Sequence, residues 1–173
     1  MKRLLFLLAV LFFSFGSSYS QSRYGFVDTE YILNKMPDYK NAQEQLDKVS
    51  IQWQKEIETI SVEIKDLHAK FRADEVFLSS EMRQQREKEI HDKEMMAQKL
   101  QQRYFGRNGE LYKKRQELMK PIQDDIYEAI KEIAKSGSYG MIIDRANGPA
   151  IIYSNSKFDL SDKVLYKLGI RTN

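Results

Sequence analysis

Apolar residues recur at spacings of three and four along the middle of the chain, and this repeat constrains the fold more than any other feature. One extra spacing of four, between Trp53 and Ile57, interrupts the alternation. The repeat consists of Tyr39, Ala42, Leu46, Val49, Trp53, Ile57, Ile60, Ile64, Leu67 and Phe71. Such residues lie along one side of an α-helix and pack against a second helix, as in a coiled coil. We therefore predict a helix over residues 39–71, on the order of 50 Å long, that needs a partner.

The partner helix is predicted in the following part of the chain, over about residues 81–135. Residues 73–80 interrupt the repeat and end in Ser79 and Ser80, either of which can cap a new helix. The positions expected to face the first helix are Met82, Ile90, Ala97, Leu100, Tyr104, Leu111, Leu118, Ile122, Ala129 and Ile133. The two helices should fold back on each other as an antiparallel hairpin, and we assign residues 39–119 to this helical arm.

Two glycines and a proline lie inside the predicted second helix. Gly106 and Gly109 each disfavour a helix interior by about 0.5 to 1 kcal/mol relative to alanine. The sequence leaves three interpretations of them open: a flexible joint in the arm, a tolerated local weakness, or a real helix break. Pro121 likewise predicts either a kink or a tolerated local distortion.

The apolar stripe on the second helix is wider than contact with one partner helix requires. Beside the column that contains Tyr104 and Leu111, another column repeats every seven residues, at Phe105, Tyr112, Met119 and Ile126. Neighbouring residues on a helix point about 100° apart. This part of the helix is therefore expected to contact two partners or to face an apolar cavity, with extra contact to the chain's own sheet as the alternative near its end.

Short strands are predicted at both ends of the chain. Residues 24–28 favour a strand, and a brief helix over residues 30–36 follows it. Near the other end, residues 141–144 and 150–153 are separated by turn residues and predict a β-hairpin. Asp159 can cap a closing helix that ends near Gly169. The fold class is therefore α+β, with the helical arm on a small β-rich body formed by residues 21–38 and 120–173.

Consecutive apolar residues in the strands predict association between copies of the chain. Side chains at consecutive strand positions point to opposite faces, so both faces of this sheet need a cover. Three short strands and one closing helix in a single chain leave edges and apolar surface exposed. A ring of copies solves this problem. The residues expected at the contact are Phe26, Met141, Ile142, Ile143, Ile151 and Ile152.

The first twenty residues have the layout of a secretory signal peptide. Lys2 and Arg3 precede an apolar run over residues 4–13, and small residues precede the Ser20–Gln21 bond, where we expect cleavage. A run of about ten residues is too short for the roughly 20 that span a membrane, which disfavours the alternative of a retained anchor. The mature chain should be exported, and the absence of cysteine excludes a disulfide framework.

The balance of charge excludes a nucleic-acid partner. Removal of Lys2 and Arg3 leaves 26 of the 28 basic residues against 25 acidic ones, so the net charge falls from +3 to +1. A nucleic-acid binder needs a basic excess on one face, whereas acidic and basic residues alternate along this chain.

No catalytic, metal-binding or cofactor-binding motif is found, so we do not expect an enzyme. His68 and His91, the only histidines, have charged neighbours and are expected at the solvated surface. Asp124 and Asp125 are adjacent on a helix, where their carboxylates diverge. Neither a glycine-rich nucleotide loop nor a hydrolase or zinc motif is present. A protein of this kind works by binding alone.

The order of these parts resembles the Skp (OmpH-like) family of periplasmic chaperones. The residues that carry the resemblance are Tyr24 to Asp28, then Glu30 to Leu33, and, near the C-terminus, Tyr139 to Asp144, Ile152-Tyr153 and Asp159 to Val164. The resemblance implies a homotrimer with a barrel-like association domain, whose arms hold unfolded outer-membrane proteins in a cavity without ATP. Because the mature chain is almost neutral, no lipopolysaccharide site is carried over.

Five residues of the arm are expected to contact a client protein: Phe77, Met95, Met96, Phe105 and Tyr112. Flexible methionines and aromatic rings suit a surface that binds many partners. For each of them a role in the helix core is the alternative. We also keep transient contact with a membrane surface among the partners. The competing function is that of a coiled-coil structural or adaptor protein of the cell envelope, which fixes one folded partner.

Overall fold

A computed structural model of the chain describes residues 23–146 and 151–171. The predicted signal peptide, residues 1–20, lies outside the described residues. The chain forms two compact units. Residues 33–127 form one, which we call the arm unit, and the described residues up to Ile32 and from Glu128 onward form the other, which we call the body unit.

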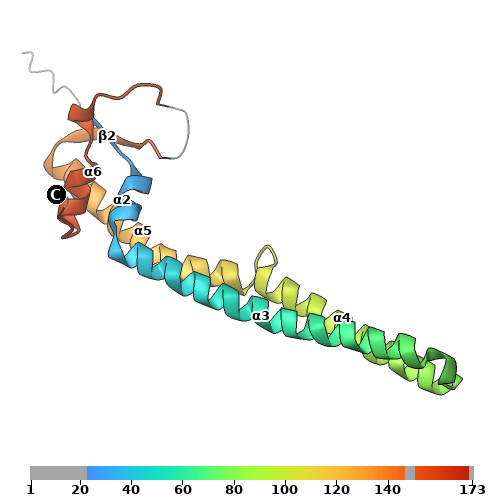
Figure 1. Cartoon of the computed structure of the whole chain (residues 1–173). Helices are drawn as coiled ribbons and strands as arrows, with labels where there is room; N and C mark the ends of the chain where they lie inside the picture. Colours follow the sequence, from blue (N-terminus) through green and yellow to red (C-terminus); the bar gives the residue numbers. More distant parts are fainter. Residues whose placement is uncertain (1–22, 147–150, 172–173) are drawn as a thin grey trace, which may run out of the picture. The chain divides into compact units, whose positions relative to one another are not determined.

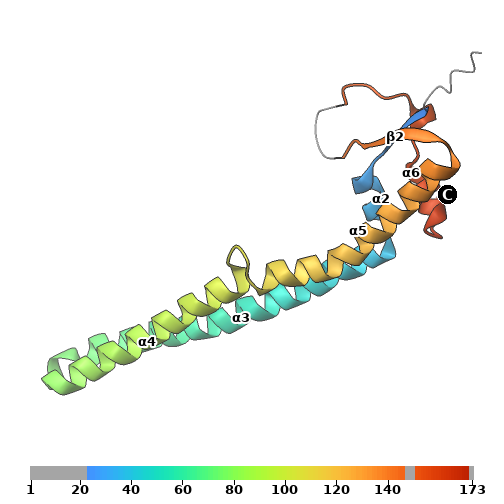
Figure 2. The same cartoon turned by 180° about the vertical axis from the view of Figure 1, so that it is seen from behind.

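Two long helices and a tight turn make up most of the arm unit. Helix α3 runs from Pro37 to Asp74, the 3₁₀ turn η1 from Glu75 to Phe77, and α4 from Ser80 to Phe105. α4 packs antiparallel along the second half of α3, and the first part of α5 continues along its first half (Figures 1 and 2). The predicted helical hairpin is confirmed.

The apolar repeat predicted to line the helix contact does so along all of α3. Each of its ten positions is buried or half-buried, with Ala42, Leu46 and Ile60 the most enclosed. On α4, Ile90 and Tyr104 are buried as predicted. Met82 is a wrong assignment, because its side chain is 51% exposed. It lies in the first turn of α4, at the end of the hairpin where the 3₁₀ turn η1 follows α3.

Local contacts fix both ends of the hairpin turn. The Ser79 hydroxyl caps α4 by accepting a hydrogen bond from the Met82 amide at 3.3 Å. The same hydroxyl donates to Glu81 at 3.1 Å, and the pKa of that carboxyl is lowered, first by its own backbone amide and then by Ser79. Arg83 pairs with Glu75 at 2.6 Å and so joins α4 to η1.

The second predicted helix is not continuous, which corrects the prediction of one helix over residues 81–135. α4 ends at Phe105, and α5 runs from Glu110 to Ser136. The two glycines thus lie at a real helix break, and the flexible joint stays a prediction. A side-chain carbon on Gly106 would lie 2.3 Å from the Gln102 carbonyl oxygen, and one on Gly109 would lie 2.7 Å from that of Tyr104. Only glycine allows the chain to turn back on α4 so closely.

α5 continues through Pro121, so the helix tolerates the proline, and a kink at this position stays a prediction. The side chain of Pro121 is exposed, and the neighbouring Ile122 and Ile126 are buried. The apolar column predicted beside the main one is therefore buried at Ile126, half-buried at Phe105 and Met119, and exposed at Tyr112.

The body unit contains a parallel pair of strands. β1 runs from Arg23 to Val27 and β2 from Tyr139 to Asp144, with Phe26 opposite Ile143. The predicted β-hairpin is wrong. Residues 151–153 belong to no strand, and residue 150 lies outside the described residues. β2 instead pairs with β1, and the two strands run in the same direction. The Arg145 amide, just after β2, donates a hydrogen bond to the Val27 carbonyl oxygen at 2.9 Å.

The small core of the body unit is drawn from both ends of the chain. Its most deeply buried side chains, each below 2% exposed, are Val27, Ile32, Leu160, Val164 and Leu165. The predicted closing helix is present as α6, from Ser161 to Lys167, after the 3₁₀ turn η2 from Ser156 to Phe158. Gly169 follows with a φ of 81°, the left-handed conformation that glycine adopts at helix ends.

Candidate functional site

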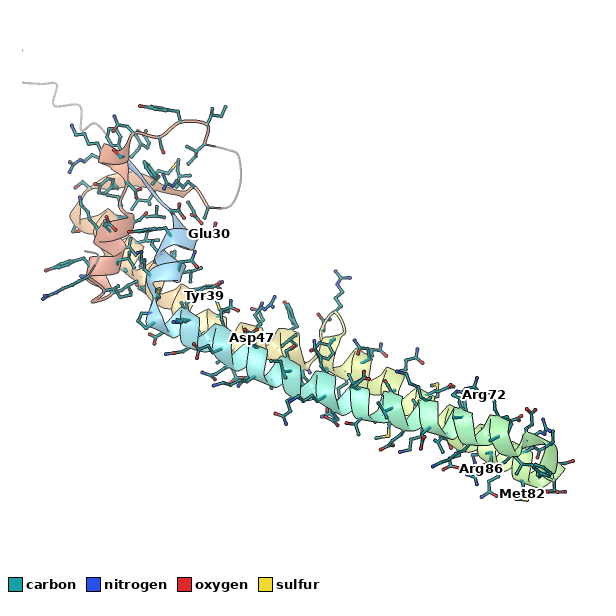
Figure 3. All side chains as sticks on the ribbon, viewed as in Figure 1. Glu30, Tyr39, Asp47, Arg72, Met82 and Arg86 are labelled. Atoms are coloured by element: carbon teal, nitrogen blue, oxygen red, sulfur yellow. The ribbon has the colours of Figure 1, made fainter. Side chains whose placement is uncertain are left out.

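The arm unit exposes large apolar side chains along its length. Up to Tyr112 they comprise Ile51, Val62, Val76, Phe77, Met82, Met95, Met96 and Tyr112, and we call this set the arm surface. Tyr127, the last residue of the unit, is also exposed but is not counted in this set. Val76 and Phe77, at the tip, are 83% and 85% exposed. Met82 lies near the same end, with Arg72 and Arg86 around it (Figure 3). Exposed apolar groups flanked by charged ones suit weak contact with a flexible, partly apolar chain.

Four of the five residues predicted to contact a client belong to the arm surface. Phe77 lies in η1, Met95 and Met96 are neighbours on α4, and Tyr112 lies in the first turn of α5. The fifth, Phe105, is half-buried and packs against Trp53. Client contact itself remains a prediction for all five.

Sequence reasoning missed four members of the arm surface as contact residues, and one of the four, Met82, it assigned instead to the helix contact. Val76 precedes Phe77 in an apolar run at the turn, so its exposure could have been predicted together with that of Phe77. Ile51 and Val62 are apolar residues of α3 that fall outside the three-and-four spacing. That departure from the repeat was the available signal, because a residue outside the stripe points away from the partner helix.

An aromatic cluster holds the helix break against α3. The Trp53 and Tyr104 rings stack at 4.7 Å between centroids, and Phe105 meets each edge-on at 6.4 Å. The Tyr104 hydroxyl donates to Glu56 at 2.9 Å, and this hydrogen bond raises the pKa of Tyr104. Stacked pairs of this kind are worth about 0.5 to 1.5 kcal/mol beyond their buried area. The cluster thus replaces the helical continuity lost at Gly106.

Exposed ion pairs join the two helices further along the arm. His68, predicted at the solvated surface, is indeed exposed and hydrogen-bonds Glu94 at 3.0 Å, and Lys93 pairs with Glu63 at 2.6 Å. Pairs at such exposure contribute only about 0 to 1 kcal/mol each. These pairs therefore contribute more to the alignment of the two helices than to the stability of the hairpin.

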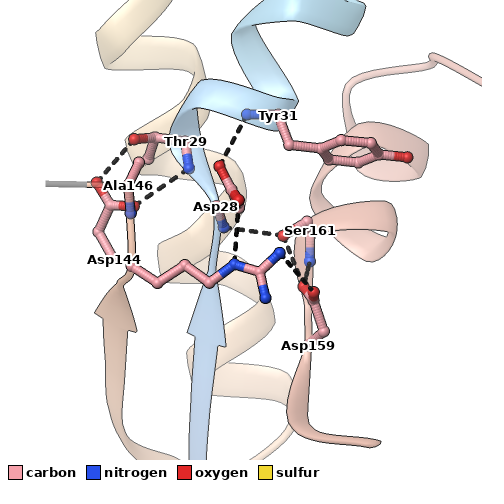
Figure 4. A network of polar contacts seen from close by, with 8 residues as sticks. Asp28, Thr29, Tyr31, Asp144, Ala146, Asp159 and Ser161 are labelled. Atoms are coloured by element: carbon pink, nitrogen blue, oxygen red, sulfur yellow. Dashed lines mark hydrogen bonds and ion pairs between the residues drawn. The ribbon is translucent and has the colours of Figure 1, made fainter. Parts of the chain in front are cut away.

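A polar network in the body unit ties the end of β1 to the C-terminal segment (Figure 4). The Arg145 guanidinium pairs with Asp28 at 3.0 Å and approaches Asp159 at 3.9 Å. Ser161 accepts a hydrogen bond from the Asp28 amide at 2.9 Å and donates its own hydroxyl to Asp159 at 2.6 Å. Every group of this network has a partner, so we interpret it as structural.

Two further contacts extend this structural role. Thr29 donates from its hydroxyl to Asp144 at 2.7 Å, which joins α2, from Thr29 to Lys35, to the end of β2. Lys167 pairs with Glu132 and lowers the pKa of that carboxyl. The first contact thus joins the start of α2 to the end of β2, and the second joins α6 to the last part of α5.

An open groove of about 780 Å³ lies in the body unit, and we call it the body groove. Its lining is mainly apolar and aromatic: Tyr24, Gly25, Phe26, Tyr139, Ile143, Ile151, Tyr153 and Phe158, with Arg23, Ser154, Asn155, Lys157 and Lys163 beside them.

The six residues predicted at the contact between copies divide into two groups. Three line the body groove: Phe26, which is 5% exposed and buried in its own chain, Ile143 and Ile151. Outside the groove lining, Met141 is 53% exposed, Ile142 is half-buried and Ile152 is 99% exposed. Exposed apolar residues therefore gather around β2 and the segment after it.

In the described ranges, 23–146 and 151–171, no three histidine or acidic side chains come together in a way that would hold a metal ion. Within the same ranges, no helix has both the length and the apolar character that crossing a membrane requires.

A comparison with known protein families shows to which family this chain belongs. The family described as outer membrane protein (OmpH-like) matches residues 23–168, which is most of the chain. The chain belongs to the OmpH-like family. The crystal structure of an OmpH-like protein from Caulobacter crescentus CB15, described as a candidate outer membrane chaperone, has the same fold. It is 14% identical, with a TM-score of 0.70 and 89% of each chain covered. No curated protein matches the sequence.

Proposed function

We propose that this OmpH-like chain is an ATP-independent holdase chaperone that binds unfolded outer-membrane proteins and prevents their aggregation. The observation that carries the proposal is the arm surface, where large apolar side chains stay exposed along a charged helical hairpin. Membership of the OmpH-like family supports a chaperone role, as does the description of the Caulobacter protein.

The proposed mechanism is retention by many weak contacts. A single apolar side chain on the arm contributes little, but several arms that share one client act at high effective concentration. An unfolded chain bound in this way is kept from other unfolded chains without being folded. Release needs no nucleotide, because membrane insertion offers the client a more favourable environment.

We propose that three copies associate through the body, residues 21–38 and 120–173, and that residues 39–119 form the client-binding arm of each. Met141, Ile143 and Ile152 support the body contact, since they are large apolar residues that a single chain leaves exposed. Exposure of this kind usually marks an interface. We place the working protein in the periplasm, after removal of residues 1–20 as a signal peptide.

The test is dilution of a urea-unfolded outer-membrane barrel into buffer that contains the purified mature protein but no nucleotide. At a molar excess of trimer, light scattering from aggregated barrel should be suppressed, and addition of ATP should not change the result. An equal mass of an unrelated soluble coiled-coil protein is the control. Aggregation as fast as in that control would contradict the proposal. Recovery of one folded partner in fixed ratio, in place of unfolded barrels, would indicate the adaptor function.

A further inference from the structure

Methionine thioethers are exposed along α4 of the arm unit. Met82, Met95 and Met96 are 51%, 38% and 48% exposed, and Met82 lies near the tip of the arm (Figure 3). Met36, in contrast, is 5% exposed and belongs to the buried core. A small oxidant in solution can therefore reach the three sulfur atoms on α4 but is kept from the sulfur of Met36.

An oxidant finds no thiol in this chain, because the sequence contains no cysteine. Cysteine and methionine are the residues whose sulfur is readily oxidised, and methionine sulfoxide is a common product. Exposed methionine is therefore the main target. Of the other described methionines, Met119 is half-buried, and Met141 is 53% exposed in a single chain, where the proposed association of copies covers it. The oxidisable sulfur that stays accessible is thus concentrated on the arm.

Oxidation of these three methionines changes the arm surface directly, because they are three of its eight members. A methionine side chain is flexible and apolar, and it adapts to partners of different shape. Its sulfoxide is polar and chiral, so it binds water that an apolar client segment would otherwise displace. Each oxidised methionine therefore removes one apolar contact from the surface.

The contact between α3 and α4 does not depend on these sulfur atoms. The side chains of α4 that are buried are Ile90 and Tyr104. Lys93 and Glu94, which directly precede the methionine pair, form their ion pairs with residues of α3. Sulfoxides at exposed positions leave these contacts in place, so the oxidised arm should remain a helical hairpin.

We propose that Met82, Met95 and Met96 form a modification site, at which hypochlorous acid oxidises the thioethers to sulfoxides and lowers the affinity of the arm for unfolded proteins. This inference rests on the proposed function and adds a means of regulation to the same surface. In each reaction the sulfur gives up two electrons and forms a bond to oxygen. The O–Cl bond breaks, and the chlorine takes both electrons and leaves as chloride, with release of one proton. Methionine sulfoxide reductases reverse the change.

The test compares the affinity of the mature protein for a labelled, unfolded outer-membrane barrel before and after treatment with hypochlorous acid, which is then quenched with free methionine. Peptide mass spectrometry should show sulfoxides at Met82, Met95 and Met96 well before any at Met36. At that stage the Kd from fluorescence anisotropy should be about ten-fold higher, which corresponds to about 1.4 kcal/mol. Far-UV circular dichroism should show unchanged helix content, and sulfoxide reductases should restore the original Kd.

The matched control carries Met82→Leu, Met95→Leu and Met96→Leu, which keep apolar side chains of similar volume but remove the three thioethers. This variant should bind the barrel as the unchanged protein does and keep its affinity after the same oxidation. An equal loss of affinity in the variant would place the effect at another residue and overturn the inference. Unchanged affinity with all three sulfoxides present, or oxidation of Met36 as early as the methionines of α4, would overturn it too. In each of these cases the untreated protein still binds and the proposed function stands, whereas an untreated protein that binds no barrel overturns both.

Discussion

The double substitution Met141→Asp and Ile143→Asp is expected to convert the purified protein from a trimer into single chains. Both side chains are exposed in one chain, at 53% and 41%, so the body unit should still fold with carboxylates there. Assembly would bury both carboxylates in an apolar contact, at a penalty of several kcal/mol for each ion. Light scattering after size-exclusion chromatography should therefore give one third of the trimer mass.

The matched control for this change is Tyr166→Asp, which introduces the same charge in the same unit. Tyr166 is 76% exposed and lies on α6, away from β2 in sequence and outside the body groove. The trimer mass should persist in this variant. Far-UV circular dichroism should show the same helix content in both variants. A double variant that keeps both its helices and its trimer mass would exclude β2 from the contact between copies.

Alanine at Phe77, Met95 and Met96 together should weaken the binding of an unfolded barrel roughly a hundred-fold. These side chains are 85%, 38% and 48% exposed, so their removal leaves the helix contact intact. If each substitution removes about 1 kcal/mol of favourable binding free energy from apolar burial, the total of about 3 kcal/mol corresponds to a factor of about 100 in Kd. Fluorescence anisotropy of a labelled barrel, titrated with protein, measures this change.

The control for the arm variant is a triple change to alanine at three exposed polar positions of α4, namely Gln84, Gln85 and Gln98. It removes side chains from the helix that carries Met95 and Met96 but little apolar surface. Binding should stay within a factor of about two of the unchanged protein, given the small contributions of exposed polar groups. Equal affinity of the two triple variants would mean that clients do not use the arm surface.

Much of the arm was predictable from sequence because its contacts obey a period. Each residue of the repeat between Tyr39 and Phe71 faces the partner helix, and a spacing rule finds such residues without knowledge of the partner. The break at Gly106 was harder to predict. A glycine penalty of about 1 kcal/mol is comparable to what the stacking of Trp53 on Tyr104 returns. Whether the helix continues there depends on this balance, which no local pattern reveals.

Among the residues predicted to contact a client, the outcome also depended on tertiary contacts that the sequence pattern does not show. Phe77 and Phe105 were both predicted to contact a client, with a role in the helix core as the alternative. Phe77 lies exposed at the turn, whereas Phe105, at the end of α4, packs against Trp53. The strand partners were not predictable by local rules. β1 and β2 are more than one hundred residues apart, and a hairpin with the next strand-like segment was the simpler expectation. Only the fold shows that β2 pairs with β1 and leaves residues 151–153 without a strand partner in the described chain.

Native mass spectrometry of the mature protein, mixed with one unfolded outer-membrane barrel and no nucleotide, tests the central claim most directly. The account predicts a complex with the mass of three chains plus one barrel, in which the barrel still exchanges its amide hydrogens as an unfolded chain does. A protein that remains a single chain, with no barrel bound at an excess of client, would contradict it.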